Sequence, residues 1–261
     1  MSSLPFAKKA LGQHWLEDQA SLEAMAMAGH IMSTDTVLEI GPGTGTLTEE
    51  LILSGAHITA LEFDAQRCKE LSHKYSQNSY IDVIQGDIRT FDLGLLPEDY
   101  KIVANIPYYL TANLLRKLAD STNKPSKAVL LVQKEVAQKV ASHEGNLSLV
   151  AIFTQIYYEV SLGQIVPAHL FVPPPKVDSQ ILILIRRNQP LFEVDESFTK
   201  LVKAGFEQKR KKLRTSLAGG LGINKDAVEQ YLQKAGIRVD ARAQELSIES
   251  WHKLSKIINN T

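Results

Sequence analysis

Short apolar runs alternate with amphipathic stretches between Asp35 and Ile185, and no other feature of the sequence constrains the fold as strongly. Runs of four or five mostly apolar residues are typical of strands buried on both faces of a mainly parallel sheet. Such runs occur at residues 37–40, 58–61, 81–84, 102–105 and 128–132. Helical patterns separate them, at residues 65–75, 110–119 and 134–141. The alternation predicts an α/β fold with a doubly wound sheet.

Two further strand patterns, at residues 157–165 and 177–187, are joined by a proline-rich connection and suit an antiparallel pair at the sheet edge. They complete a seven-stranded, Rossmann-like, mainly parallel sheet. Beyond Pro190 the pattern is helical, with segments at residues 196–217, 225–235 and 248–258. We therefore predict two domains, a larger α/β domain over residues 1–187 and a small all-α domain over residues 188–261.

A glycine-rich turn, G-P-G-T-G at residues 41–45, follows the first strand and precedes a helical stretch at residues 47–54. The third glycine comes one residue earlier than in the G-x-G-x-x-G fingerprint, in which a helix N-terminus meets the pyrophosphate of a dinucleotide. S-adenosylmethionine carries no phosphate and needs only close approach of its amino acid and ribose to the backbone, which glycines permit. The spacing therefore favours S-adenosylmethionine, with Gly41 and Gly43 as contacts. Glu39, just before the turn, could assist around the cofactor's ammonium group or fix the loop.

Acidic residues follow the next two strands. Glu62 ends the second strand, where a carboxylate can accept hydrogen bonds from two ribose hydroxyls. Asp87 closes the third strand, where it can accept the amino group of the cofactor's adenine. Either residue alone is better explained as a surface loop carboxylate. Together with the glycine turn, at the ends of successive strands, they predict a nucleoside cofactor.

The motif N-I-P-Y-Y at residues 105–109 ends the fourth strand and is the most specific short motif in the chain. Methylation of an exocyclic amine requires the lone pair to be localised on nitrogen, and acceptors for the amine hydrogens achieve this. The Asn105 side-chain oxygen and the Ile106 carbonyl are the candidate acceptors. Pro107 stiffens the backbone, and Tyr108 can lie on the face of the target base. Positioning then supplies most of the rate, without a strong general base; the structural alternative is a capped turn with both tyrosines in the core.

A base in a paired nucleic acid cannot reach such a pocket, so the target adenine must be turned out or presented unpaired. Phe171 is our candidate for a second aromatic wall, because the proline run at residues 173–175 can fix a loop over the pocket. A core position is the alternative for this residue.

The net charge of the chain is zero, but the charges are unevenly distributed. Residues 1–184 hold 14 basic and 20 acidic side chains, whereas residues 185–261 hold 15 basic and 9 acidic ones. A basic C-terminal domain can meet phosphates, although a solvated helical surface would have the same composition.

The cations are densest between residues 200 and 216. If this segment is one helix, Lys203, Arg210 and Arg214 fall on one side, and Phe206 and Leu213 turn toward the domain core. The residues predicted to bind RNA are Lys209, Arg210, Lys211, Lys212 and Arg214.

Cys68 is the only cysteine, so neither an intramolecular disulfide nor a cysteine-rich metal site is expected, and we predict no metal. The chain has no apolar run of the roughly 18 residues that a membrane helix needs. Residues 1–15 lack the apolar core of a secretory signal. We therefore expect a cytoplasmic protein without a membrane partner.

With these residues in view, the chain resembles the ribosomal RNA adenine dimethyltransferases, the KsgA family, over nearly its whole length. The shared motifs are the segment at residues 9–16, the Glu-Ile-Gly-Pro-Gly turn, Glu62, Gly86-Asp87, Asn-Ile-Pro-Tyr-Tyr and Pro-Pro-Lys-Val-Asp-Ser. Residues 206–213 are similar to the family's basic C-terminal helix. The resemblance implies that His14, Leu16, Gly41, Glu62, Asp87 and Asn105 contact the cofactor. The chain departs from the family in Trp15, where phenylalanine is usual, and in a shorter loop at residues 140–147.

The resemblance also implies a reaction: transfer of four methyl groups from S-adenosylmethionine, two to each of two adjacent adenosines in a hairpin near the 3′ end of 16S rRNA. The implied partner is a partly assembled small ribosomal subunit, in whose biogenesis a monomeric enzyme takes part. Three alternatives remain open. They are a large-subunit rRNA methyltransferase conferring antibiotic resistance, a non-catalytic nucleic-acid-binding factor on the same fold, and a small-molecule methyltransferase. The basic C-terminal domain is hard to explain in a small-molecule methyltransferase.

Overall fold

The computed structural model describes residues 14–208 and 210–259. The chain divides into two compact units. Unit 1 comprises Met1–Gln138 and Tyr158–Arg187, and unit 2 comprises Lys139–Tyr157 and Asn188–Thr261. In the described ranges, no helix is both long enough and apolar enough to cross a membrane.

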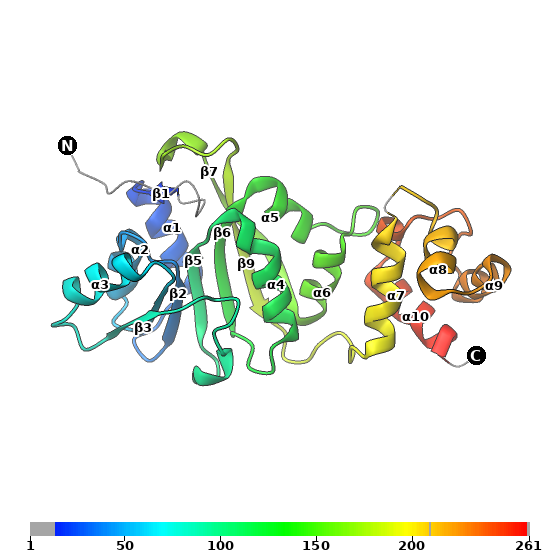
Figure 1. Ribbon diagram of the computed structural model, residues 1–261, viewed down its shortest axis with the longest axis horizontal. Helices are drawn as coiled ribbons and strands as arrows, with labels where there is room; N and C mark the ends of the chain where they lie inside the picture. Colours follow the sequence, from blue (N-terminus) through cyan, green and yellow to red (C-terminus); the bar gives the residue numbers. More distant parts are fainter. Residues whose placement is uncertain (1–13, 209, 260–261) are drawn as a thin grey trace. The chain divides into compact units, whose positions relative to one another are not determined.

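Unit 1 is built on a seven-stranded sheet with the strand order β4-β3-β2-β5-β6-β9-β7 (Figure 1). The strands from β4 to β6 in this order pair in parallel, and β9 and β7 pair antiparallel to their neighbours. Their bounds are β2 Thr36–Ile40, β3 His57–Glu62, β4 Ile81–Gln85, β5 Lys101–Asn105, β6 Lys127–Gln133, β7 Tyr158–Val166 and β9 Ser179–Arg186. The predicted doubly wound, mainly parallel sheet with an antiparallel pair at one edge is confirmed.

Helices cover both faces of this sheet. Ile102, Val103 and Ala104 in β5 are all fully buried, and successive side chains of a strand point to opposite faces. On the Val103 face, Met25 and Leu51 from two helices join the same apolar cluster. The helices that follow β1 along unit 1 are α1 Gln19–Gly29, α2 Thr46–Ile52, α3 Ala65–Lys74, α4 Thr111–Asp120 and α5 Lys134–Val140.

The carboxyl ends of four parallel strands meet at one edge of the sheet. The strand register pairs Ile40 with Leu61, and Glu62 with Gln85. Asn105 is the last residue of β5, and β2 lies between β3 and β5 in the sheet. The glycine turn, the two predicted carboxylates and the N-I-P-Y-Y motif therefore all lie at this edge.

A small second sheet, which we did not predict, forms from two short strands. β1 (Trp15–Leu16) pairs antiparallel with β8 (Phe171–Val172), placing Trp15 opposite Val172 and Leu16 opposite Phe171. The pairing ties the start of the described chain to the proline-rich connection between β7 and β9.

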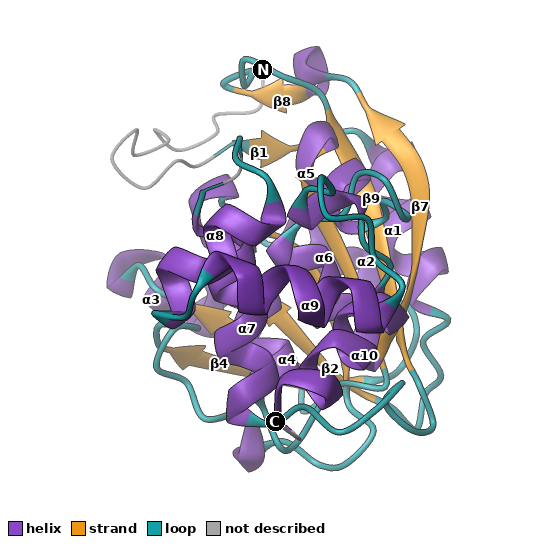
Figure 2. Ribbon diagram, turned by 90° about the vertical axis from the view of Figure 1, so that its right-hand side faces the viewer, coloured by secondary structure: helices purple, strands orange, loops and turns teal. Residues whose placement is uncertain are grey.

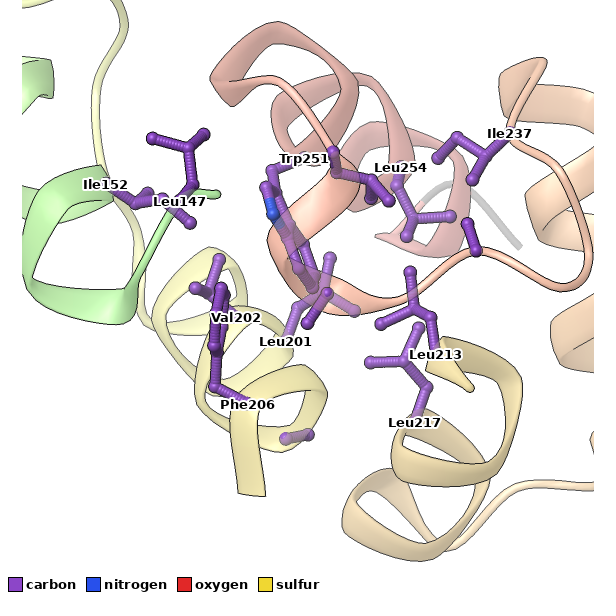
Figure 3. Packing of buried hydrophobic residues seen from close by; sticks show 14 of the residues in the cluster. Leu147, Ile152, Leu201, Val202, Phe206, Leu213, Leu217, Ile237, Trp251 and Leu254 are labelled. Carbon is purple, nitrogen blue, oxygen red and sulfur yellow. The ribbon is translucent and has the colours of Figure 1, made fainter. Parts of the chain in front are cut away.

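In the described residues of unit 2, all regular secondary structure is helical (Figure 2). Its main helices are α6 Leu149–Tyr157, α7 Glu196–Glu207, α8 Leu213–Leu221, α9 Lys225–Ala235 and α10 Ile248–Asn259. Leu147 and Ile152 pack in the same core as Leu201 and Trp251 (Figure 3). Residues 139–157, which we expected in the first domain, therefore belong to the helical unit, because α6 buries its apolar side chains there.

The basic segment is not one helix, so the predicted helix over residues 196–217 is wrong. α7 ends at Glu207 and α8 begins at Leu213, whose backbone N–H donates to the Ala241 carbonyl oxygen. α8 packs closely on α7, since a Cβ on Gly220 would lie 2.6 Å from the Ala204 Cβ. Arg210, Lys211 and Lys212 lie in the connection between the two helices. Arg210 consequently shares no helical face with Lys203 and Arg214.

Candidate active site

A cavity opens at the edge of the sheet where β2, β3, β4 and β5 end. It is lined by backbone and side chains from every motif that we singled out at those strand ends. The lining residues are His14, Ile40–Gly41, Leu61–Phe63, Gly86–Arg89 and Asn105–Leu110.

The glycines of the turn have different surroundings. Gly41 (φ +69°) and Gly43 (φ +60°) both adopt backbone angles that favour glycine. A Cβ on Gly41 would meet nothing within 4 Å, so the cavity is open at this residue. A Cβ on Gly43 would lie 2.2 Å from the Trp15 ring, and Gly43 does not line the cavity. Gly43, predicted as a cofactor contact, is therefore the platform for Trp15.

The Glu62 carboxylate is held by two backbone hydrogen bonds. Its Oε2 accepts from the Gly43 N–H at 3.1 Å, and its Oε1 accepts from the Asp64 N–H at 2.8 Å. Burial raises the pKa of Glu62, although these hydrogen bonds oppose the rise. The backbone thus fixes the carboxylate at the cavity wall. Two residues later, Asp64 is the N-cap of α3.

Glu39 is buried away from the cavity lining. Only 1% of it is exposed, and its Oε2 accepts a hydrogen bond of 2.6 Å from the Thr48 hydroxyl on α2. Burial raises the pKa of Glu39 to about 8, and the neighbouring Glu62 carboxylate adds to the rise. Of the two roles left open for Glu39, this contact supports fixing the turn against α2.

Asp87 lies at the cavity beside a cation that we did not single out. Its carboxylate accepts hydrogen bonds from Arg89 Nε at 2.9 and 3.0 Å and from Arg89 Nη2 at 2.6 Å. The Arg89 hydrogen bonds hold the pKa of Asp87 below its ordinary value. Asp87 is thus an ionised acceptor whose direction is set by Arg89.

Asn105 has a defined amide orientation. Its Nδ2 donates to the backbone carbonyl oxygen of His14 at 3.3 Å. Because a carbonyl can only accept, this contact assigns the amide nitrogen and leaves Oδ1 as the acceptor of the side chain. Asn105 and Ile106, the residues that carry the two predicted acceptors, both line the cavity.

Tyr108 is held on two sides. Its ring stacks on the His14 imidazole, with centroids 5.7 Å apart and planes inclined by 24°. Its hydroxyl lies 2.7 Å from the Ser179 hydroxyl. His14 is itself anchored, because its Nδ1 lies 2.7 Å from the Pro173 carbonyl oxygen and must be the donor in that contact.

Two predicted site residues lie in the core instead of at the cavity. Phe171, the expected second aromatic wall, and Leu16, an expected cofactor contact, are each 1% exposed and face each other across the β1–β8 pair. Both belong to the apolar cluster of unit 1, and neither lines the cavity. The expectation that Phe171 holds the base does not fit this arrangement.

Several lining residues went unpredicted. Phe63, Arg89 and Tyr109 each stand within two positions of a predicted residue, so adjacency along the chain was the available signal. Ser179 ends the Pro-Pro-Lys-Val-Asp-Ser motif, but nothing in the sequence indicates that its hydroxyl meets Tyr108.

The predicted RNA-binding cations lie in unit 2. Arg210, Lys211 and Lys212 are exposed in the connection between α7 and α8. Arg214, in the first turn of α8, forms an ion pair with Glu229 on α9. Lys209 lies outside the described residues.

The chain is similar to a defined set of known proteins. The profile of the family described as Ribosomal RNA adenine dimethylase matches residues 6–260. The Ribosomal RNA small subunit methyltransferase A of Dehalococcoides mccartyi is 40% identical over 253 residues, which cover 95% of this chain and 87% of that protein. The protein of the same name from Nostoc sp. is 34% identical over 267 residues, which cover 96% of this chain and 97% of that one.

Two solved structures are similar over most of the chain. A dimethyladenosine transferase from Plasmodium falciparum has a TM-score of 0.80 and 25% identity, with 95% of this chain and 98% of that chain covered. The 23S rRNA methyltransferase ErmE has a TM-score of 0.75 and 29% identity, with 94% and 99% covered.

Proposed function

The chain belongs to the ribosomal RNA adenine dimethylase family, and on that basis we propose that it dimethylates the exocyclic amines of two adjacent adenosines near the 3′ end of small-subunit rRNA. It is an S-adenosylmethionine-dependent methyltransferase. The observation that carries the proposal is the arrangement of Asn105, whose Oδ1 is the available acceptor, beside Tyr108 in one cavity.

The cavity fits S-adenosylmethionine by its own chemistry. The open space at Gly41 admits a ligand to the backbone, and the fixed Glu62 carboxylate suits ribose hydroxyls. Asp87 offers an ionised acceptor to an adenine amino group. When bound, the cofactor supplies an electrophilic methyl group on a sulfonium.

The residues of the chain position the target amine. Asn105 Oδ1 and the Ile106 carbonyl accept its two hydrogens, which localises the nitrogen lone pair for attack on the methyl group. Tyr108, clamped by His14 and Ser179, presents its ring to the target base. The amine loses its proton after attack, so positioning supplies most of the rate without a strong general base.

RNA recognition falls to the exposed cations of unit 2. Arg210, Lys211 and Lys212 lie on a connection free to meet phosphates, with Lys209 next to them in sequence. We expect Arg214 to contribute less, because Glu229 already pairs with it. The proposed partner is a partly assembled small ribosomal subunit, and the enzyme is proposed to act as a cytoplasmic monomer.

A small-subunit target is favoured over a large-subunit one. The relatives at 34% and 40% identity carry small-subunit names, whereas the 23S rRNA enzyme is 29% identical. A purely non-catalytic role does not explain why the acceptor geometry around Asn105 is intact. To test the function, unmethylated small subunits are incubated with the protein and labelled cofactor, and their rRNA is digested to nucleosides. We expect N6,N6-dimethyladenosine at two adjacent positions; methylation of large subunits instead would refute the proposal.

A further inference from the structure

Two large aromatic side chains at the cavity are exposed. Phe63 and Tyr109 are 54% and 55% exposed, whereas the neighbouring Tyr108 is shielded by His14 and Ser179. An aromatic ring that is exposed beside a ligand cavity is available to stack on a bound base. Phe63 follows the proposed ribose contact Glu62. Tyr109 follows Tyr108, the proposed contact of the target base, and lines the same cavity.

Two surface hollows lie next to the cavity, on the side of Arg89 and Leu110. The first hollow shares Ile88, Arg89 and Leu110 with the cavity and extends to Asn113 and Lys117 on α4. The second hollow shares Asn113 and Lys117 with the first and extends further to Arg116. A polymer strand leaving the cavity past Tyr109 can therefore follow α4.

The first hollow carries cations. Arg89 is half-exposed, and its contacts with Asp87 use Nε and Nη2, so Nη1 remains for a phosphate. Arg89 and Tyr109 both line the cavity. Lys117 approaches the Arg89 carbonyl oxygen at 3.4 Å.

Acidic residues lie mainly at the far end. Asp92 and Asp120 line the second hollow, and Asp120 pairs with Arg116 there. The combination of an aromatic platform and adjacent cations is how proteins hold single-stranded nucleic acid: bases stack while cations track the backbone.

We propose that Tyr109 is a stacking platform for the base of the nucleotide adjacent to the target adenosine. Arg89 and Lys117 then contact the phosphate that joins these two nucleotides or the next phosphate along the strand. The inference rests on the proposed function and extends it. In an RNA with two adjacent adenosines, the second base stacks on the Tyr109 ring while the first base occupies the cavity. The enzyme thereby holds both substrate bases of one dinucleotide in a single docking event.

The test uses small subunits reconstituted from two unmethylated rRNAs. One has the natural adenosine pair, and the other has an abasic ribose in place of the neighbouring adenosine. Tyr109→Ala should lower affinity for the natural subunit on the order of tenfold, and the abasic substitution should lower wild-type affinity by a similar factor. Because both changes remove one stack, the variant should bind the abasic subunit no more weakly than the wild type does.

The controls separate stacking from other effects. Tyr109→Phe keeps the ring and should bind as the wild type does. Tyr80→Ala removes a tyrosine that is 59% exposed next to the amino end of β4 and should change nothing. If Tyr109→Ala weakens binding equally for both subunits, or for neither, the platform is refuted. If the wild type transfers no methyl group to either subunit while still binding S-adenosylmethionine, the proposed function itself fails.

Discussion

The hydroxyl of Ser179 lies 2.7 Å from the hydroxyl of Tyr108, linking the fully buried first residue of β9 to the aromatic ring at the active-site cavity. On its face the same ring stacks on His14. Tyr108 is therefore fixed both at its tip and across its plane before any base arrives, which lowers the cost of ordering it on binding.

Ser179→Ala should slow methyl transfer by about tenfold or less, the range expected for one lost hydrogen bond. Because the effect passes through the Tyr108 hydroxyl, Tyr108→Phe should slow transfer similarly, and the double variant should be no slower than either single one. Single-turnover rates on unmethylated subunits measure this, with cofactor affinity as the control. Additive losses would show that Ser179 acts by another route.

Glu39→Gln should flatten the dependence of stability on pH. Burial raises the pKa of Glu39 from 4.5 to about 8, so between these values the folded protein keeps a proton that the unfolded chain has lost. The unfolding free energy therefore falls as pH rises through this window, by at most about 1.4 kcal/mol per pH unit. The glutamine can still accept from Thr48 but has no proton to lose.

Thermal unfolding at several pH values between 5 and 8 measures the difference, with the exposed Glu98→Gln as a control for the loss of one carboxylate. We expect the melting temperature of Glu39→Gln, relative to that of the parent, to increase as pH rises. Parallel curves for parent and variant would contradict the assignment of a raised pKa.

Glu62→Ala should weaken S-adenosylmethionine binding by about 1–3 kcal/mol, because hydrogen bonds to a charged acceptor are lost. The variant also leaves the Gly43 and Asp64 N–H groups without this partner, so its fold is checked by circular dichroism. Calorimetry gives the affinity. An unchanged value in a folded variant would remove Glu62 from the cofactor site.

Replacing Lys209, Arg210, Lys211 and Lys212 by glutamine should flatten the salt dependence of subunit binding, because phosphate contacts release counterions. Cofactor affinity should stay unchanged, since the cofactor cavity is built by unit 1. The matched control replaces Lys225, Lys234, Lys253 and Lys256, which are exposed elsewhere in unit 2. Equal slopes for the parent and the first variant would show that the α7–α8 connection is not the docking surface.

The central strands were predictable because strands buried on both faces leave short, continuous apolar runs. The edge strands β4 and β7 are largely exposed, but their strand patterns were also recognised, and each of the seven predicted segments became a strand. Helices α1 and α6 were not predicted. α1 has little periodic contrast between apolar and polar faces, and α6 is apolar along most of its length, a pattern that does not distinguish a buried helix from a strand. The place of α6 in unit 2 depends on contacts with α7, which lies far away in sequence. The α7–α8 break was missed because a run of cations is as compatible with an exposed helix as with a loop.

Some residues of the candidate site could likewise be predicted from the sequence, and others could not. Gly41, Glu62, Asp87 and Asn105 line the cavity because the carboxyl ends of parallel strands meet at one edge of the sheet. His14, expected from the family resemblance alone, also lines it and is held there by Pro173 and Tyr108. Gly43, Leu16 and Phe171 do not line it, since their positions depend on how Trp15 and the β1–β8 pair fold over the turn. Tertiary packing of this kind leaves no periodic signal in the sequence.

The variant Asn105→Ala removes the side-chain acceptor on which the proposed methyl transfer depends. The rate of transfer of labelled methyl groups to unmethylated small subunits is measured beside Asn78→Ala, a control just before the amino end of β4. We expect Asn105→Ala to fold normally, with an unchanged melting profile, and to transfer no detectable methyl group, because the acceptor that localises the amine lone pair is gone. Near-wild-type transfer by this variant would contradict this expectation.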